Sequence, residues 1–184
     1  PMCGTGTLLI EAAMIARNIA PGSNRNFASE KWDFISEQDW LDVRDDAFSM
    51  EDYDREVKIY GSDIDPDTIE IAKTNIEKAG VEDDVILDCK NFLDMEVEDE
   101  FGALITNPPY GDRLLDEESV ERLYRLLGDV CRMRIPKWSY YIITSNKNFE
   151  KCFGKKATKN RKLYNGGIEC YYYQYYGVKN GNKR

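Results

Sequence analysis

The sequence contains no histidine among its 184 residues. This absence excludes catalysis by a Ser-His-Asp triad or a Cys-His pair, because both need an imidazole as the base. The five cysteines (Cys3, Cys89, Cys131, Cys152 and Cys170) include no C-x-x-C pair, which disfavours a structural zinc site. An odd number of scattered cysteines is typical of buried free thiols in a reducing cytoplasm. We therefore expect a cytoplasmic protein that binds no metal.

The sequence also lacks long apolar runs and targeting segments. It has no window of about 18 apolar residues, so we expect no membrane span. Residues 1–13 lack the basic region that opens a signal peptide. The first residue is Pro1 rather than Met, and we interpret 1–184 as a single catalytic domain that is a fragment of a longer protein.

Charge is distributed unevenly along an acidic chain. The formal net charge is −9 and the sequence pI is about 4.7, which argues against a nucleic-acid-binding surface over the whole chain. Residues 147–184 hold ten Lys/Arg and two Glu, which leaves 15 and 32 for residues 1–146 from the totals of 25 and 34. The basic end is either a solvated lysine-rich surface or a contact for an anionic partner.

Helix-like and strand-like segments alternate until the end of the chain. We expect strands at 57–65, 84–89, 101–107 and 138–146, helices at 6–22, 66–80 and 118–135, and a short helix or turn at 147–154. Two closing strands, 157–165 and 168–177, are joined by Asn165-Gly166-Gly167, which is a hairpin signal. This order predicts an α/β fold with a doubly wound, mostly parallel sheet and a C-terminal antiparallel hairpin.

Two segments rich in aromatic residues fit more than one structure. Residues 22–55 are expected to form a loop with short amphipathic helices, either packed against the domain or forming a flap near a substrate. The tyrosine-rich stretch 171–176 suits a buried face of the hairpin or a dimer contact.

Ligands of a doubly wound sheet bind beyond the carboxyl ends of its strands, and two of the candidate sites precede helices there. In "MCGTGT" (2–7), Gly4 and Gly6 let the backbone approach a ligand at a helix N-terminus, although a simple turn explains this pattern equally well. Asp63, at the end of the strand in "YGSDID", suits a ribose hydroxyl. Asp65 is better explained as the N-cap of the next helix.

Two further candidate sites follow the next strands. Asp88 ends "VILDC" and suits an adenine amino group, although a loop-capping role would explain it alone. At 107–110, Asn-Pro-Pro-Tyr stops a strand abruptly, because proline donates no hydrogen bond to a ladder. The Asn107 side chain and the Pro108 carbonyl are two acceptors suited to one exocyclic –NH2 group, and Tyr110 offers a ring on which a base can stack. The alternative is a stiff loop with a packed tyrosine.

Four motifs together carry a family resemblance. "PMCGTGTLLIEAA", "GSDID", "NPPYGDRL" and "NGGIECYYYQY" resemble class I S-adenosylmethionine-dependent methyltransferases, and more narrowly the THUMP-associated RNA guanine-N2 methyltransferase family of the bacterial large-subunit rRNA enzyme type. The resemblance implies a Rossmann-like fold, S-adenosyl-L-methionine as cofactor and methyl transfer to guanine N2 in RNA, with 23S rRNA as the expected substrate. The Asp and strand that open the family's first motif are missing here, and the family's THUMP RNA-binding domain lies upstream.

The resemblance also implies roles for individual residues. The cofactor-binding set is Cys3, Gly4, Thr5, Gly6, Asp63, Ile64, Asp88 and Asn107, and the catalytic set is Asn107, Pro108, Pro109 and Tyr110. The basic segment 147–162 would help to hold RNA. An N6-adenine methyltransferase of DNA or RNA and an inactive cofactor- or RNA-binding scaffold remain alternatives. A nicotinamide oxidoreductase is disfavoured, because the glycine turn lacks the third spaced glycine of that fingerprint.

Overall fold

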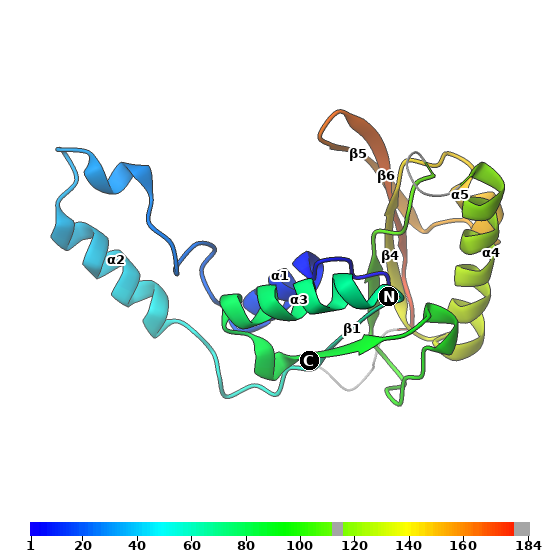
Figure 1. Cartoon of the computed structure of the whole chain (residues 1–184), viewed down its shortest axis with the longest axis horizontal. Helices are drawn as coiled ribbons and strands as arrows, with labels where there is room; N and C mark the ends of the chain where they lie inside the picture. The colour runs from blue at the N-terminus through cyan, green and yellow to red at the C-terminus, as the bar shows by residue number, and fades with distance from the viewer. Residues whose placement is uncertain (112–115, 179–184) are drawn as a thin grey trace. The chain divides into compact units, whose positions relative to one another are not determined.

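The computed structural model describes residues 1–111 and 116–178. The chain forms two compact units (Figure 1). The first unit comprises Pro1–Cys3, Ser62–Asp65 and Cys89–Arg184, and the second comprises Gly4–Gly61 and Pro66–Asp88. Three segments that are far apart in the sequence therefore come together in the first unit.

The first unit is built on a four-stranded sheet with the order β3-β4-β6-β5. Its strands are β3 (Ala103–Thr106), β4 (Ser139–Thr144), β5 (Lys159–Asn165) and β6 (Ile168–Tyr175), and its helices are η3 (Phe92–Asp94), α4 (Glu117–Arg134) and α5 (Phe149–Phe153). Strand β3 is parallel to β4, whereas β6 is antiparallel to both β4 and β5. Gly166 has φ +59°, which suits the tight turn that joins β5 to β6.

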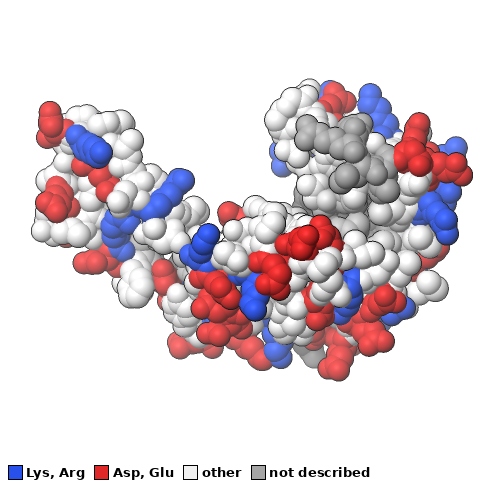
Figure 2. All heavy atoms as spheres, viewed as in Figure 1, with Lys and Arg blue, Asp and Glu red and all other residues white. Residues whose placement is uncertain are grey.

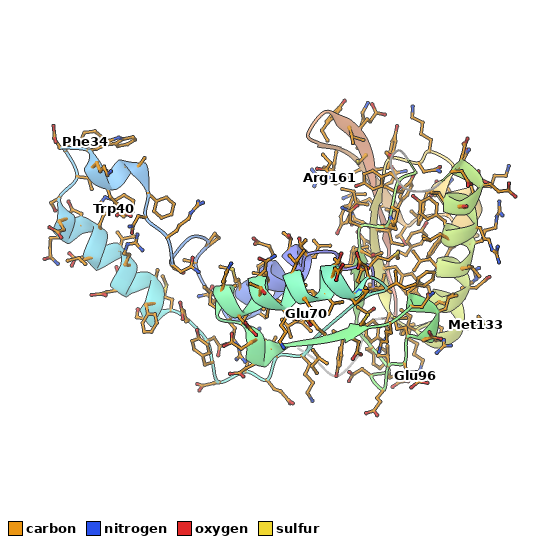
Figure 3. All side chains as sticks on the ribbon, in the orientation of Figure 1. Phe34, Trp40, Glu70, Glu96, Met133 and Arg161 are labelled. Atoms are coloured by element: carbon orange, nitrogen blue, oxygen red, sulfur yellow. The ribbon has the colours of Figure 1, made fainter. Side chains whose placement is uncertain are left out.

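The core of the first unit lies between α4, α5 and the sheet. Helix α4 buries residues spaced three or four apart, as an amphipathic helix packed on a sheet does: Val120, Tyr124, Leu127 and Cys131. Aromatic rings from α5 and β6 complete the core; Phe153 and Tyr175, for example, have ring centroids 4.8 Å apart. Figure 3 shows side chains filling the space between α4 and the sheet.

The second unit contains the glycine turn and two contacting helices. Its elements are α1 (Thr7–Ala16), η1 (Ala28–Lys31), α2 (Glu37–Ser49), α3 (Pro66–Ala79) and η2 (Glu82–Asp84); the paired strands β1 (Ile59–Asp63) and β2 (Val85–Cys89) lie mostly within it. Helix α1 contacts α3. Figure 2 shows acidic side chains, in red, around these two helices, and Glu70 on α3 is labelled in Figure 3.

The segment 22–55 differs from the expectation of short helices. Helix α2 runs for 13 residues and begins with a capping box, in which the Ser36 hydroxyl accepts the Asp39 N–H at 3.1 Å. None of its residues is buried. Phe34, labelled in Figure 3, is 81% exposed, so most of this segment's aromatic surface is not packed against other described residues.

The predicted α/β class and the closing hairpin are confirmed. The described strands form two sheets rather than one, and the larger sheet is mixed rather than mostly parallel, because the hairpin supplies two of its three strand pairings. The prediction of buried thiols holds for Cys131, Cys152 and Cys170, but Cys89 is exposed at the end of β2. Within the described ranges no helix is long and apolar enough to span a membrane, and no cluster of three potential metal ligands occurs.

Candidate functional site

The loop after β3 presents a polar side chain on a fixed base. Strand β3 ends at Thr106, which is followed by an exposed Asn107, a buried Pro108 and an exposed Pro109. Thr106 and Pro108 are both among the fully buried side chains, so the loop is anchored in the core on either side of the exposed Asn107. Asn107 therefore stands at the carboxyl end of the strand with its side chain accessible, as the predicted role requires. The rest of the motif NPPYGDRL, 112–114, lies outside the described residues.

A buried pair of hydroxyl groups is hydrogen-bonded to this loop. The Tyr124 hydroxyl donates to the Pro109 carbonyl at 2.8 Å and lies 2.8 Å from Thr144 Oγ1. Because a carbonyl only accepts, the single Tyr124 hydrogen is used there, and Thr144 must donate to Tyr124. Both side chains are fully buried. Burial raises the pKa of Tyr124 to about 12, so the phenol stays protonated and able to donate at neutral pH.

Tyr110, the next residue of this loop, lies next to the β5–β6 hairpin. Its ring is half-buried, and its hydroxyl oxygen is buried without a hydrogen-bond partner of ordinary geometry among the described residues. Burial and the neighbouring Cys170 thiol raise the pKa of Tyr110, whereas Asn165 and Asn107 act in the opposite direction. The hydroxyl end therefore faces the protein. Tyr110 also lines a cavity of about 350 Å³, and the predicted stacking role would use the part of its ring that is not buried.

Three chain segments converge within the first unit. The Cys3 N–H donates to the Ser62 carbonyl at 3.0 Å, and the Thr106 hydroxyl donates to the Pro1 carbonyl at 2.6 Å. Burial and the nearby Asp63 carboxylate raise the pKa of the Cys3 thiol. The segment before the glycine turn is thus bonded both to the end of β1 and to the end of β3.

The end of β1 forms a turn of its own. Asp63 Oδ1 accepts the Asp65 N–H at 3.2 Å, and the Asp63 carbonyl accepts the Lys90 N–H at 2.9 Å. The Cys89 thiol donates to the carbonyl of Ile64, whose side chain is 68% exposed. The structure thus brings Cys3, Asp63 and the segment 107–110 into one unit.

The other predicted cofactor residues belong to the second unit. Gly4 and Gly6 have φ values of +55° and +87°, which glycine adopts without strain. A Cβ on Gly6 would lie 3.3 Å from the Ala72 side chain of α3, so the turn lies close against that helix. The Thr5 carbonyl accepts the Asn75 amide at 3.0 Å. Asp88 lies exposed on β2.

Sequence reasoning missed the residues that support the loop after β3. Tyr124 lies on the apolar face of α4 and was grouped with none of the candidate residues, because a tyrosine at helical spacing first suggests packing. Thr106 and Thr144 each end a strand, β3 and β4, and these strands are neighbours in the sheet. The signal in the sequence that could have indicated these residues was a threonine at the last position of each of two neighbouring strands.

Two curated relatives show what the chain is similar to. It is 45% identical over 181 residues to YpsC of Bacillus subtilis (strain 168), whose name assigns it provisionally to the RNA methyltransferases, and this match covers 96% of the chain and 46% of YpsC. It is 38% identical over 188 residues to the ribosomal RNA large subunit methyltransferase K/L of Shewanella loihica, covering 100% of the chain and 26% of the relative. The chain thus spans less than half the length of either protein.

Solved structures resemble the chain along most of its length. SMU.472, crystallised as a complex with SAH, superposes with a TM-score of 0.93 at 45% identity, covering 97% of this chain and 47% of that one. A Listeria monocytogenes protein described as a predicted N6-adenine-specific DNA methylase gives 0.88 at 49% identity, covering 96% and 45%. These matches confirm the Rossmann-like methyltransferase fold.

One family model accounts for nearly the whole sequence. The model described as UPF0020, the RMKL-like methyltransferase domain, matches residues 1–174. Three of the four motifs of the sequence analysis fall within this range, and the fourth, in the closing hairpin, ends one residue beyond it at Tyr175. The chain therefore belongs to the RMKL-like methyltransferase domain family.

Proposed function

We propose that the intact protein transfers a methyl group from S-adenosyl-L-methionine to the exocyclic N2 amine of guanine in RNA, with 23S rRNA as the substrate. The observation that carries this proposal is the exposed Asn107 at the end of β3, on a loop anchored by the buried Pro108 and the Tyr124 hydroxyl. The names of two curated relatives support RNA as the substrate class. The SMU.472 complex with SAH, the demethylated cofactor, supports S-adenosyl-L-methionine as the methyl donor.

The acceptors of the loop would prepare the amine for reaction. The lone pair of guanine N2 is delocalised into the ring, which makes it a poor nucleophile. Hydrogen bonds from its two N–H groups to Asn107 Oδ1 and the Pro108 carbonyl would make the nitrogen more pyramidal and more nucleophilic. The cofactor supplies an electrophilic methyl group on its sulfonium. Placement of the amine in line with that methyl at near-attack distance supplies much of the rate.

The rest of the chain fits this chemistry without histidine. The proton leaves the amine after methyl transfer, so no imidazole base is needed. The positive φ of Gly4, with open space around its Cβ position, leaves the backbone accessible to a ligand, as a cofactor turn requires. The roles of Gly4 and Gly6 toward the methionine end, of Asp63 toward the ribose and of Asp88 toward the adenine stay predictions of the resemblance.

Substitution of Asn107 tests the proposal directly. We expect Asn107→Ala to abolish turnover and to change cofactor affinity by only a few-fold, because the acceptor acts on the amine. Asn24→Ala, which replaces an exposed asparagine outside both this loop and the basic segment 147–162, is the matched control and should retain full activity. Turnover by steady-state kinetics and cofactor affinity by calorimetry measure the two effects. Near-wild-type turnover of the Asn107 variant would contradict the proposal.

The substrate is tested with the full-length protein, labelled S-adenosyl-L-methionine and total rRNA from cells that lack the gene. The RNA is digested and its methylated nucleosides are separated. Label in N2-methylguanosine supports the proposal. Label in N6-methyladenosine favours the second candidate function, an N6-adenine methyltransferase, which the Listeria description supports and which would use the same Asn-Pro-Pro-Tyr loop. No label in any nucleoside favours an inactive scaffold.

The basic segment 147–162 is the proposed RNA contact of this chain. Lys159 and Arg161 are exposed on β5, and Arg161 is labelled in Figure 3. Lys155 lies over the rings of Tyr140 and Tyr175, and Lys162 pairs with Glu169 at 2.5 Å. The more distal Lys179, Lys183 and Arg184 lie outside the described residues.

Charge reversal tests this contact. We expect Lys159→Glu combined with Arg161→Glu to weaken RNA binding at least tenfold and to flatten its salt dependence, because each phosphate contact releases counterions. Unchanged affinity and salt slope would contradict the proposal. An upstream THUMP domain as the main phosphate contact, and a cytoplasmic location, stay predictions of the resemblance and of the cysteine pattern.

A further inference from the structure

A polar cavity of about 350 Å³ lies beside the catalytic loop, within the first unit. It is lined by Tyr110 and Gly111 from the loop after β3, by Glu117 from the first turn of α4, and by residues 145–148, which follow β4. The volume is at the lower end of the range for small-molecule sites. The proposed chemistry uses Tyr110 but none of the other lining residues.

The two walls of this cavity are fixed by the same buried groups. The Asn146 N–H donates to Thr144 Oγ1 at 3.1 Å, and Thr144 bonds to Tyr124, whose hydroxyl donates to the Pro109 carbonyl. The loop that carries Tyr110 and the loop that follows β4 are therefore held by one hydroxyl pair. A cavity with walls joined in this way is formed before a ligand arrives, which distinguishes it from a dent in a mobile surface.

Donors of known orientation come from the loop after β4. Asn146 Oδ1 accepts the Asn148 N–H at 2.7 Å, which fixes the orientation of the amide. The oxygen of Asn146 is thereby used, and its –NH2 group remains as a donor. Lys147, next in the chain, adds an exposed ammonium group, which only donates.

The hydrogen-bond acceptor of the cavity comes from α4. Glu117 is exposed in the first turn of α4, and its carboxylate only accepts hydrogen bonds at neutral pH. The cavity thus combines an anionic acceptor from α4 with neutral and cationic donors from the loop after β4, next to a tyrosine ring. This set matches a flat ligand that carries donors along one part of its edge and an acceptor along another.

Guanine and adenine differ in this respect. Guanine has the N2 amine, then N1–H, then the O6 acceptor along one edge. Adenine has its N6 amine next to N1, which is an acceptor. With the target amine at Asn107 and the edge of the base in the cavity next to Tyr110, a carboxylate of the cavity lining would accept N1–H of guanine, whereas it would face a lone pair of adenine and leave a polar contact unmade.

We infer that Glu117, Asn146 and Lys147 determine the specificity of the target-base pocket for guanine. Glu117 accepts N1–H, and the Asn146 amide with Lys147 donates to O6. This inference rests on the proposed function, since it assumes that a nucleobase amine is methylated at Asn107. It adds to that function the residues that discriminate guanine from adenine.

The test uses a base analogue that keeps the reacting amine. 2,6-Diaminopurine has the 2-amino group of guanine, but an amine replaces O6 and a lone pair replaces N1–H. The full-length protein is assayed on RNA with guanine or 2,6-diaminopurine at the mapped target position. The quantity measured is kcat/KM for guanine divided by kcat/KM for 2,6-diaminopurine. In Glu117→Gln the amide can donate to the analogue's N1, so we expect this ratio to fall roughly tenfold to a hundredfold, the value of one good base contact.

Glu118→Gln is the matched control. Glu118 is exposed in the same turn of α4 but does not line the cavity. A ratio that falls in Glu117→Gln and not in Glu118→Gln supports the inference. An unchanged ratio in Glu117→Gln, or an equal fall in both variants, overturns it while N2-methylguanosine formation leaves the proposed function intact. Formation of N6-methyladenosine by the wild-type protein, or no nucleoside product, overturns both.

Discussion

In the first unit, Phe149 and Phe153 are fully buried, whereas Trp32 and Phe34 in the segment 22–55 are 52% and 81% exposed. Both regions are rich in aromatic residues and both contain amphipathic helices. In the first unit the rings meet one another: Phe149 lies 4.9 Å from Tyr173 and 5.2 Å from Phe153, between ring centroids. The aromatic side chains therefore build a core only where a sheet and a second helix face them.

The exposed region is held by polar contacts instead. The Arg44 guanidinium donates to the carbonyls of Ser23 and Arg25 and to Glu30, at 2.7 to 2.8 Å. Phe27 stacks on Trp40 with the ring centroids 5.8 Å apart. An isolated helix of the length of α2 is marginal in water, so these contacts and its capping box stabilise it. The difference teaches that residue type alone does not decide burial; the opposing surface does.

The largest expected effect contrasts the two regions through one substitution in each. We expect Phe153→Ala to lower the free energy of unfolding by about 3–5 kcal/mol, because it removes a fully buried ring and leaves a cavity. Phe34→Ala should change it by less than about 0.5 kcal/mol, because Phe34 is mostly solvated. Urea unfolding of the full-length protein, followed by circular dichroism, gives both values. Equal losses would show that Phe34 is packed in solution and would remove the contrast.

Much of the first unit could be predicted from the sequence. The periodic residues of α4 and the Asn-Gly turn of the hairpin identified a helix and two strands to within a few residues, because local patterns and turn chemistry agree there. The prolines after Thr106 located the end of β3 and thus the candidate site. The sequence also singled out Tyr110 as a candidate, but the surroundings of its buried hydroxyl include Asn165 and Cys170, which come from the distant hairpin.

The rest of the site depends on contacts between distant segments. No local pattern links Tyr124 to Pro109 or to Thr144, because the bonds span 15 and 20 residues and need the packed sheet to form. The cavity wall that contains Glu117 and Asn146 is equally non-local. For 22–55 the pattern indicated helices correctly in kind, but periodicity carries no information on whether a partner surface is present.

The ionisation of tyrosines at high pH gives a smaller effect on stability, which also distinguishes the buried aromatic residues of the first unit from the exposed ones of the segment 22–55. Burial raises the pKa of Tyr173 from its usual value of 10 to about 12, and the nearby Glu150 and Tyr171 act in the same direction. The folded protein then keeps the phenol proton while the unfolded chain loses it. The stabilisation from Tyr173 is therefore complete below pH 10 and is lost progressively as the pH rises through about 12.

Tyr124 and Tyr140, also buried, have their pKa raised to about 12 and add to the same loss. We therefore expect the urea midpoint to fall above pH 10 together with the appearance of tyrosinate absorbance. Tyr173→Phe should make this fall shallower, because it removes one of the titrating phenols. Tyr53→Phe, which replaces a tyrosine that is 60% exposed in the segment 22–55, should change the profile less, because the pKa of Tyr53 is raised mainly by its hydrogen bond to Glu51 and less by burial. If the two variants gave the same profile, the buried and exposed aromatic regions would not differ in solvation as the structure indicates.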